Sequence, residues 1–255
     1  QAGTPKVAAR LTHEGQAATL TLTQTVPATP GQPDKQPMPI PLNLALFDRE
    51  SGNHAGEELV VLDSETAQFS FDGFATRPVL SINRGFSAPV SIDRDVPRDE
   101  LVFLAARDDD PFARYEAMQE LMTGYLVGSV SGELDDAERD AARGDIAQAM
   151  RAVIEDSALD DLMRGELMVM PSQAYIAEQM LIADPGSIHA AREALKADVA
   201  TRLADPLHAL YERAAQVPFA LDAEAKGARK VKTLALSYAA AGDPATASGL
   251  AAQQY

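Results

Sequence analysis

The pattern of hydrophobic and polar positions changes once along the chain, between residues 81 and 121. Before the change, short stretches alternate apolar and polar residues, which is typical of half-buried strands. The last alternating residues are Phe86, Ala88, Val90 and Ile92. After the change, apolar residues recur at spacings of three and four, which is typical of amphipathic helices. The first residues at this spacing are Phe112, Tyr115, Met118, Met122 and Tyr125. The pattern therefore predicts an all-β domain over residues 1–97 and an all-α domain over residues 98–255.

The first domain is predicted to be an immunoglobulin-like β-sandwich of seven strands between about residues 7 and 93. Two strands should lie on either side of residues 13–16, and the segment 87–90 should belong to the last strand. The clearest strand face is made of Ile40, Leu42, Leu44 and Leu46. Pro41 lies between these residues and has no backbone N–H, so we expect this strand at an edge of its sheet.

Four Asp-Pro pairs punctuate the second half of the chain. The aspartates of these pairs are Asp110, Asp184, Asp205 and Asp243. Aspartate accepts hydrogen bonds from the free amides of a first helical turn, and proline is tolerated at the first helical position. Each pair, and the sequence Met170-Pro171-Ser172, therefore predicts the start of a helix. Several helices of medium length joined by short turns indicate a stacked, superhelical α array.

Composition excludes several classes of function. The chain has 255 residues, 46% of them hydrophobic, and a formal net charge of -16, so nucleic acid and anionic membrane surfaces are not expected as partners. It has no cysteine, which excludes disulfides, thiol nucleophiles and thiolate zinc sites. We find neither a membrane-spanning apolar run nor a signal-peptide pattern, and we expect a soluble, cytoplasmic protein. The start at Gln1 suggests a piece of something longer.

The residues show no recognisable catalytic motif. His13, His54, His189 and His208 stand in unrelated contexts, without the His-Glu-x-x-His spacing of a zinc site. Asp108-Asp109-Asp110 resembles a cation site, but the calcium-loop spacing is missing and Asp110 is explained as a helix cap. Acidic pairs such as those at residues 155–156 and 160–161 are common in so acidic a chain, and most of them are expected to be solvated. We therefore assign no catalytic, cofactor-binding or metal-binding residue.

Several ordered blocks of sequence resemble a known family. They are residues 1–5, 27–30, 35–37, 86–90, 101–104 and 108–117, the last of which contains Phe112-Ala113-Arg114-Tyr115-Glu116-Ala117. In this order they are similar to bacterial aminopeptidase N, the zinc-dependent aminopeptidase family of the gluzincin type. Tyr115 stands where a tryptophan is common in that family.

The resemblance implies a place within a larger enzyme that removes N-terminal amino acids from peptides. It implies that the catalytic domain, with its zinc ligands, lies in an earlier part of the chain and would be the partner of this region. These residues would then be the spacer sandwich and the first part of a helical cap that encloses the active-site cavity. The implied fragment has no cofactor of its own and is expected to be inactive.

The alternative is a free-standing module that binds peptides or proteins, because superhelical helix arrays also serve as scaffolds. A helical array that stops partway should also expose apolar surface at its end. We therefore expect self-association near Leu250.

Overall fold

The computed structural model describes residues 2–252, which divide into two compact units. The first contains the described residues up to Glu100 together with Arg107–Ala113, and the second contains Leu101–Ala106 and the residues from Arg114 onward. The short segment Arg107–Ala113 thus belongs to the first unit although helices surround it in the sequence. The domain boundary at residues 97–98 stays a prediction.

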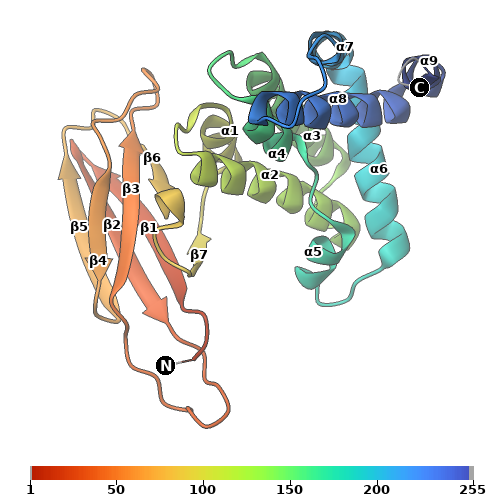
Figure 1. Cartoon of the computed structure of the whole chain (residues 1–255). Coiled ribbons are helices and arrows are strands. Elements are labelled where there is room, and N and C mark those ends of the chain that lie inside the picture. The colour runs from red at the N-terminus through yellow and green to blue at the C-terminus, as the bar shows by residue number, and fades with distance from the viewer. Residues whose placement is uncertain (1, 253–255) are drawn as a thin grey trace. The chain divides into compact units, whose positions relative to one another are not determined.

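The first unit is an immunoglobulin-like sandwich, as the alternating pattern predicted (Figure 1). The strands of the described residues are β1 (Lys6–Glu14), β2 (Ala17–Thr25), β3 (Ile40–Phe47), β4 (Glu58–Leu62), β5 (Thr66–Asp72), β6 (Val79–Ile82) and β7 (Ser91–Arg94). One sheet has the order β5-β2-β1-β7 and the other has the order β4-β3-β6. β1 and β2 form the predicted antiparallel pair, and β7 runs parallel to β1.

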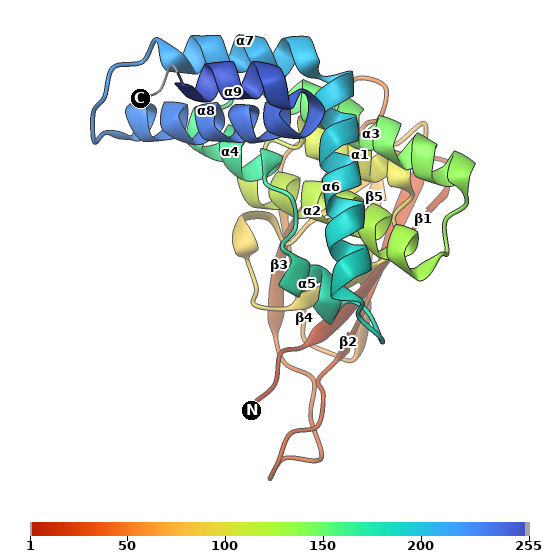
Figure 2. The ribbon, with the colours of Figure 1, turned by 90° about the vertical axis from the view of Figure 1, so that its right-hand side faces the viewer.

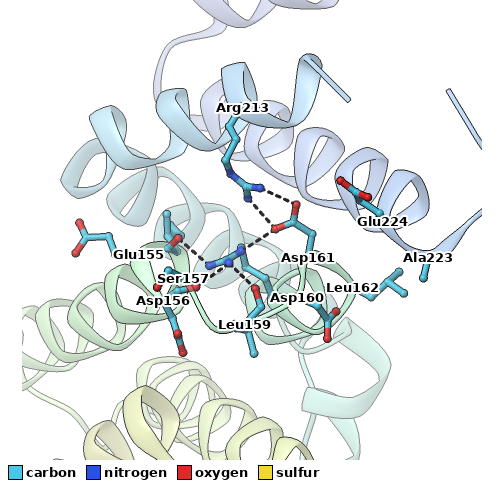
Figure 3. Close-up of a pocket in the computed structure, with 12 residues that line it drawn as sticks. Glu155, Asp156, Ser157, Leu159, Asp160, Asp161, Leu162, Arg213, Ala223 and Glu224 are labelled. Carbon is cyan, nitrogen blue, oxygen red and sulfur yellow. Dashed lines mark hydrogen bonds and ion pairs between the residues drawn. The ribbon is translucent and has the colours of Figure 1, made fainter. Parts of the chain in front are cut away.

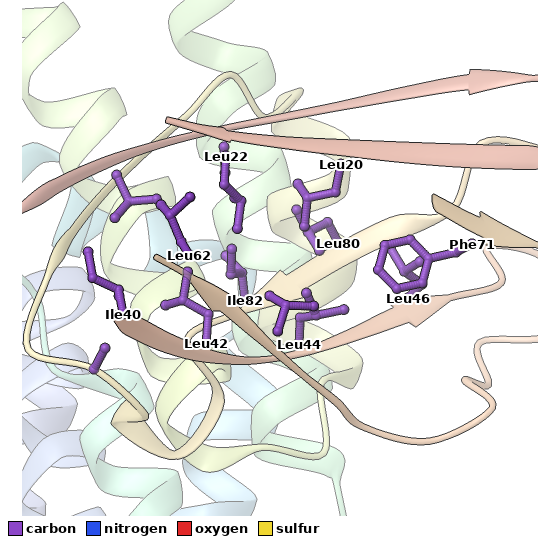
Figure 4. Packing of buried hydrophobic residues seen from close by; sticks show 14 residues of the cluster. Leu20, Leu22, Ile40, Leu42, Leu44, Leu46, Leu62, Phe71, Leu80 and Ile82 are labelled. Carbon is purple, nitrogen blue, oxygen red and sulfur yellow. The ribbon is translucent and has the colours of Figure 1, made fainter. Parts of the chain in front are cut away.

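The core of the sandwich is formed by the inward faces of both sheets (Figure 4). Leu20 and Leu22 of β2 are fully buried, and they face a row of buried residues on the other sheet. That row includes Ile40, Leu42, Leu44, Leu62, Leu80 and Ile82. Burying each such side chain stabilises the fold by roughly 1.5–3 kcal/mol before the entropy of ordering is counted.

The prediction that β3 lies at an edge was wrong, because β3 is the middle strand of its sheet. It pairs with β4 over Ile40–Leu44, and it pairs with β6 only over Leu44–Phe47. Pro41 therefore lies in the half of the strand that has one neighbour. A missing N–H is tolerated there because β6 does not extend that far.

The segment 87–90 is not a strand, which corrects a second prediction. Residues 84–86 form a short 3-10 turn, and β7 begins only at Ser91. The side chain of Asn83 holds this shape, because its Oδ1 accepts hydrogen bonds from the Ala88 amide and from the Ser87 hydroxyl. Side-chain bonds to nearby backbone compete with strand pairing.

The second half of the chain is helical, as predicted (Figure 2). Its described helices are α1 (Arg98–Arg107), α2 (Pro111–Ser131), α3 (Asp136–Glu155), α4 (Asp161–Met168), α5 (Gln173–Glu178), α6 (Pro185–Arg202), α7 (Ala204–Ala215), α8 (Ala223–Gly242) and α9 (Pro244–Ala252). Within the second unit, α8 packs against α4, α6, α7 and α9. None of the helices in the described part of the chain is long and apolar enough to cross a bilayer.

Three of the four Asp-Pro predictions were correct. Asp184 caps α6 and accepts a bond from the Gly186 amide, and α2 and α9 begin at the prolines that follow Asp110 and Asp243. Ser172 likewise caps α5. Asp205 is the exception, because α7 starts one residue before it at Ala204, where Leu203 provides no side-chain cap.

Candidate functional site

A buried arginine organises a cluster of charges in the first unit. The guanidinium of Arg84 is almost completely buried and contacts three carboxylates. It donates to Glu57 at 2.9 Å, to Asp108 at 2.8 Å and to Asp109 at 2.6 Å. Asp108 is fully buried, whereas Asp109 is largely exposed. The cluster therefore ties the segment between α1 and α2 to the turn that follows β6.

The backbone of that turn is strained. Asn83, Gly85 and Phe86 all have positive φ angles, of 61°, 62° and 53°. A left-handed conformation is unusual for a residue as bulky as phenylalanine, and it persists only where surrounding contacts impose it. Here the Gly85 amide donates to Asp110, and the ring of Phe86 lies 5.2 Å from the ring of Phe112. The bonds to the aspartates thus hold a strained turn in place.

The three consecutive aspartates have three different structural roles. Asp110 caps α2 through a bond from the Ala113 amide at 2.8 Å, as predicted. Burial raises the pKa of Asp108, and bonds from Ser81 and the Asp110 amide and the charge of Arg84 oppose this only in part. Burial would also raise the pKa of Asp109, but hydrogen bonds from Arg84 and His54 outweigh it and hold that pKa below its usual value.

The four histidines do not come together. His54 contacts Asp109 at 3.2 Å and packs edge-on against Phe47. His13 is bonded to the carbonyl of Phe74, and His189 is bonded to Gln173. In residues 2–252, no group of three or more histidine, aspartate or glutamate side chains is arranged to hold a metal ion. The residues present therefore do not fit the zinc ion of the resembled family.

The second unit contains a cavity of about 830 Å³ between the end of α3, the start of α4, the end of α7 and the start of α8 (Figure 3). Asp161 lines this cavity, and its carboxylate accepts two hydrogen bonds from Arg213, at 2.7 and 3.0 Å. Burial would raise the pKa of Asp161, but the bonds from Arg213 and Arg164 hold it below its usual value. This carboxylate therefore stays ionised and serves as an anchor between helices.

Arg164 also lines this cavity. Its buried guanidinium donates to the carbonyls of Val153 and Ile154, and also to those of Asp156 and Leu159 at 2.8 and 2.7 Å. The last four carbonyls of a helix have no partner within the helix. Arg164 therefore caps the C-terminal end of α3, while its Nε donates to Asp161 at 2.9 Å.

In these two acidic pairs Glu155 and Asp160 are exposed, whereas Asp156 and Asp161 are half-buried, so solvation does not describe the whole of either pair. Asp156 binds Arg114 at 2.9 Å, Asp160 caps α4, and Asp161 binds two arginines. Sequence reasoning missed all of the arginines involved. The pattern holds one usable signal, since an arginine on an otherwise apolar helix face, as at Arg114, indicates a buried charge that needs partners.

Comparison with known proteins shows two matching family models. One, described as a domain of unknown function (DUF3458) with an Ig-like fold, matches residues 3–95. The other, described as a domain of unknown function (DUF3458_C) with ARM repeats, matches residues 98–255.

Several proteins to which this chain is similar are aminopeptidases. Aminopeptidase N of Escherichia coli is 31% identical over the whole of this chain, which spans 30% of that protein. Aminopeptidase N of Caulobacter vibrioides is 34% identical over 73% of the chain, which spans 21% of that protein. A crystal structure of Legionella pneumophila aminopeptidase A in complex with aspartic acid has the same fold, with a TM-score of 0.79 over 97% of this chain and 29% of that one, at 23% identity. The chain therefore belongs to the DUF3458_C family, in the form found in aminopeptidase N-type proteins, with the Ig-like DUF3458 domain directly before the helices.

Proposed function

We propose that the chain is a non-catalytic part of a zinc-dependent aminopeptidase, and that it acts as the spacer and cap of a catalytic domain formed by another part of the longer protein. The observation that carries this proposal is the match to aminopeptidase N over the full length of the chain but over only 30% of that relative. The sandwich would be the spacer, and the helices would cover a cavity that admits short peptides and excludes folded proteins. No residue of this chain is assigned a catalytic role.

The structure supports a scaffold in one further respect. A few charged side chains in each unit are engaged as anchors. Arg84 and Arg164 each donate to several oxygen acceptors, and Asp161 is held by two arginines. A general acid or base needs a proton that it can exchange with substrate, whereas these groups are committed to holding elements together. In the cell we propose a cytoplasmic address, like that expected from the composition.

The experiment is an activity assay on the purified chain. We expect no turnover of an aminoacyl-arylamide, with or without added zinc, while the chain is folded by circular dichroism. Zinc-dependent turnover above the blank would overturn the proposal.

Reading the coding sequence upstream of Gln1 separates the alternatives. A His-Glu-x-x-His motif some hundreds of residues earlier supports the peptidase, whereas a start codon immediately upstream supports a free-standing interaction module.

A further inference from the structure

The loop between β2 and β3, residues 26–39, is rich in proline and polar residues, yet it is tightly held. The ammonium group of Lys35 lies within hydrogen-bond distance of three oxygen atoms, one on the segment before β1 and two within the same loop. It donates to the Ala2 carbonyl at 2.8 Å, to the Thr29 hydroxyl at 2.7 Å and to Gln32 Oε1 at 2.9 Å. An ammonium group has three protons to donate, so the number of acceptors matches the number of protons.

The acceptors are themselves fixed by a tight turn. The amide of Thr29 donates to the carbonyl of Gln32 at 3.2 Å, and the amide of Gln32 returns a bond to Thr29 at 2.9 Å. Gln32 Oε1 also accepts a bond from the Ala2 amide at 2.9 Å. Gly3 then passes so close to the loop that a Cβ atom there would lie 3.3 Å from the Pro27 carbonyl. The chain leading into β1 therefore lies directly against the turn.

The other end of the loop is anchored separately, by Gln24 on β2. Its buried amide group donates to the carbonyls of Met38, Leu62 and Ser64, and its Oε1 accepts a bond from the Met38 amide at 2.8 Å. Gln24 thus fixes where the loop returns to the sheet. Only the distal part of the loop depends on Lys35.

We propose that Lys35 acts as an internal cation that clasps the distal part of the loop, residues 27–37, to the segment that leads into β1. The ammonium supplies a positive charge among three oxygen acceptors. Hydrogen bonds with one charged partner are about twice as strong as neutral ones. A loop of this length would otherwise carry the conformational entropy of an unpaired connection.

Under the proposed function, the segment at Ala2 would connect the sandwich to the preceding part of the longer protein, and the clasp would fix the direction in which that connection enters. This consequence rests on the proposed function. Protease and amide-exchange measurements report on the clasp itself, so a failure of the clasp and a failure of the spacer role give different results.

Trypsin provides the test, because it cleaves after lysine and the bond from Lys35 to Gln36 is a normal substrate. We expect slow cleavage at this bond in the chain, compared with a free peptide of residues 26–39. The variants Thr29→Val and Gln32→Leu remove one acceptor each and leave the cleavage site intact. Each should raise the rate at this bond roughly 3- to 10-fold, which corresponds to the loss of one or two hydrogen bonds.

The matched control is Thr12→Val, which removes a hydroxyl from β1 at the opposite end of the strand and should leave the rate unchanged. A second measurement uses amide exchange. Lys35→Met should speed exchange at the Ala2 and Gln32 amides several-fold, while Lys6→Met, a neighbouring exposed lysine, should not. Cleavage of the unmodified chain as fast as the free peptide, or equal rates in all variants, would overturn the proposal. Because the comparison of the unmodified chain with the peptide needs no variant, equally fast cleavage would overturn the proposal even if a variant fails to fold.

Discussion

At the scale of single residues, a few buried arginines determine how the charges of this acidic chain are used. Each of three arginines exposes at most 6% of its surface, namely Arg84, Arg114 and Arg164. Each donates hydrogen bonds to carboxylates or to helix-end carbonyls. Removing one member of such a group leaves the rest buried without a partner. The loss is therefore larger than for an exposed ion pair.

The first prediction compares two neighbouring aspartates that bind the same arginine. Asp108→Ala should lower the free energy of unfolding by about 3 kcal/mol, because it leaves Arg84 buried with fewer acceptors. Asp109→Ala should cost about 1 kcal/mol or less, because that carboxylate is mostly exposed. Urea denaturation measures both, and equal losses would contradict the assignment of Asp108 as the buried partner.

The second prediction concerns Arg164. Arg164→Met should lower the free energy of unfolding by about 3 kcal/mol or more, since several carbonyls and Asp161 lose their donor at once. Arg164→Lys should not restore it, because an ammonium cannot reproduce the planar fork of a guanidinium. Arg151→Met on the exposed side of α3 is the control, with an expected loss within about 1 kcal/mol. Full rescue by lysine would show that the charge alone matters.

At the scale of elements, local side-chain caps determine where helices begin, as at Asp184. At Asp205 there is no such cap, and the helix starts one residue earlier. The third prediction therefore contrasts two Asp-Pro pairs. Asp184→Ala should destabilise the chain by about 1 kcal/mol, because it removes the bonds to Gly186 and Ser187. Asp205→Ala should change stability by less than about 0.5 kcal/mol, since Asp205 provides no cap. Thermal and urea denaturation of the two variants give the comparison. A loss at residue 205 equal to that at residue 184 would contradict it.

At the scale of the whole molecule, the acidic excess makes stability dependent on pH. Asp109, Asp156 and Asp161 have pKa values below the usual range in the folded chain, because arginine bonds outweigh the effect of burial. When folding lowers the pKa of a carboxyl group, that group binds fewer protons in the folded chain than in the unfolded chain at pH values between and near the two pKa values. Its stabilisation is present above the unfolded value, about 4, and is lost as the pH falls through the folded pKa. The raised pKa of Asp108 acts in the opposite direction.

The fourth prediction is that the free energy of unfolding falls as the pH is lowered from about 5 to about 2. Urea titrations at several pH values measure it. The variant Asp161→Asn removes one of the responsible groups and should make the decline shallower, whereas Asp108→Asn should not. Stability that stays constant or rises below pH 4 would contradict the prediction.

The fifth prediction is self-association, which we now expect at exposed apolar side chains other than Leu250. Leu250 is 9% exposed and its carbonyl accepts a bond from the Tyr211 hydroxyl, so it does not supply the expected apolar surface. Leu181, Ile182 and Phe219 are each at least 80% exposed instead. We expect a mass above that of the monomer in light scattering at high concentration, reduced by Leu181→Ser with Ile182→Ser. A clean monomer would contradict it.

The sequence by itself determined that strands come first and helices follow, and where most of the helices begin. Alternation and helical spacing are local properties, and so is an aspartate or serine that caps the amides two or three residues ahead, as at Asp110, Ser172 and Asp184. These signals need no knowledge of the rest of the chain. The family resemblance came from the same linear order of blocks.

Only the tertiary structure decided which distant groups meet. The middle position of β3 depends on β6, about 40 residues later, and a strand's own pattern does not reveal how many neighbours it has. Hydrogen bonds join Arg84 to Asp108, Arg164 to the end of α3, and Lys35 to Ala2. The hydrophobic periodicity of the sequence does not predict these pairings. Charged residues satisfy their bonds wherever the packed apolar faces bring acceptors together. Their roles therefore follow from the fold, because the hydrophobic pattern places the elements first.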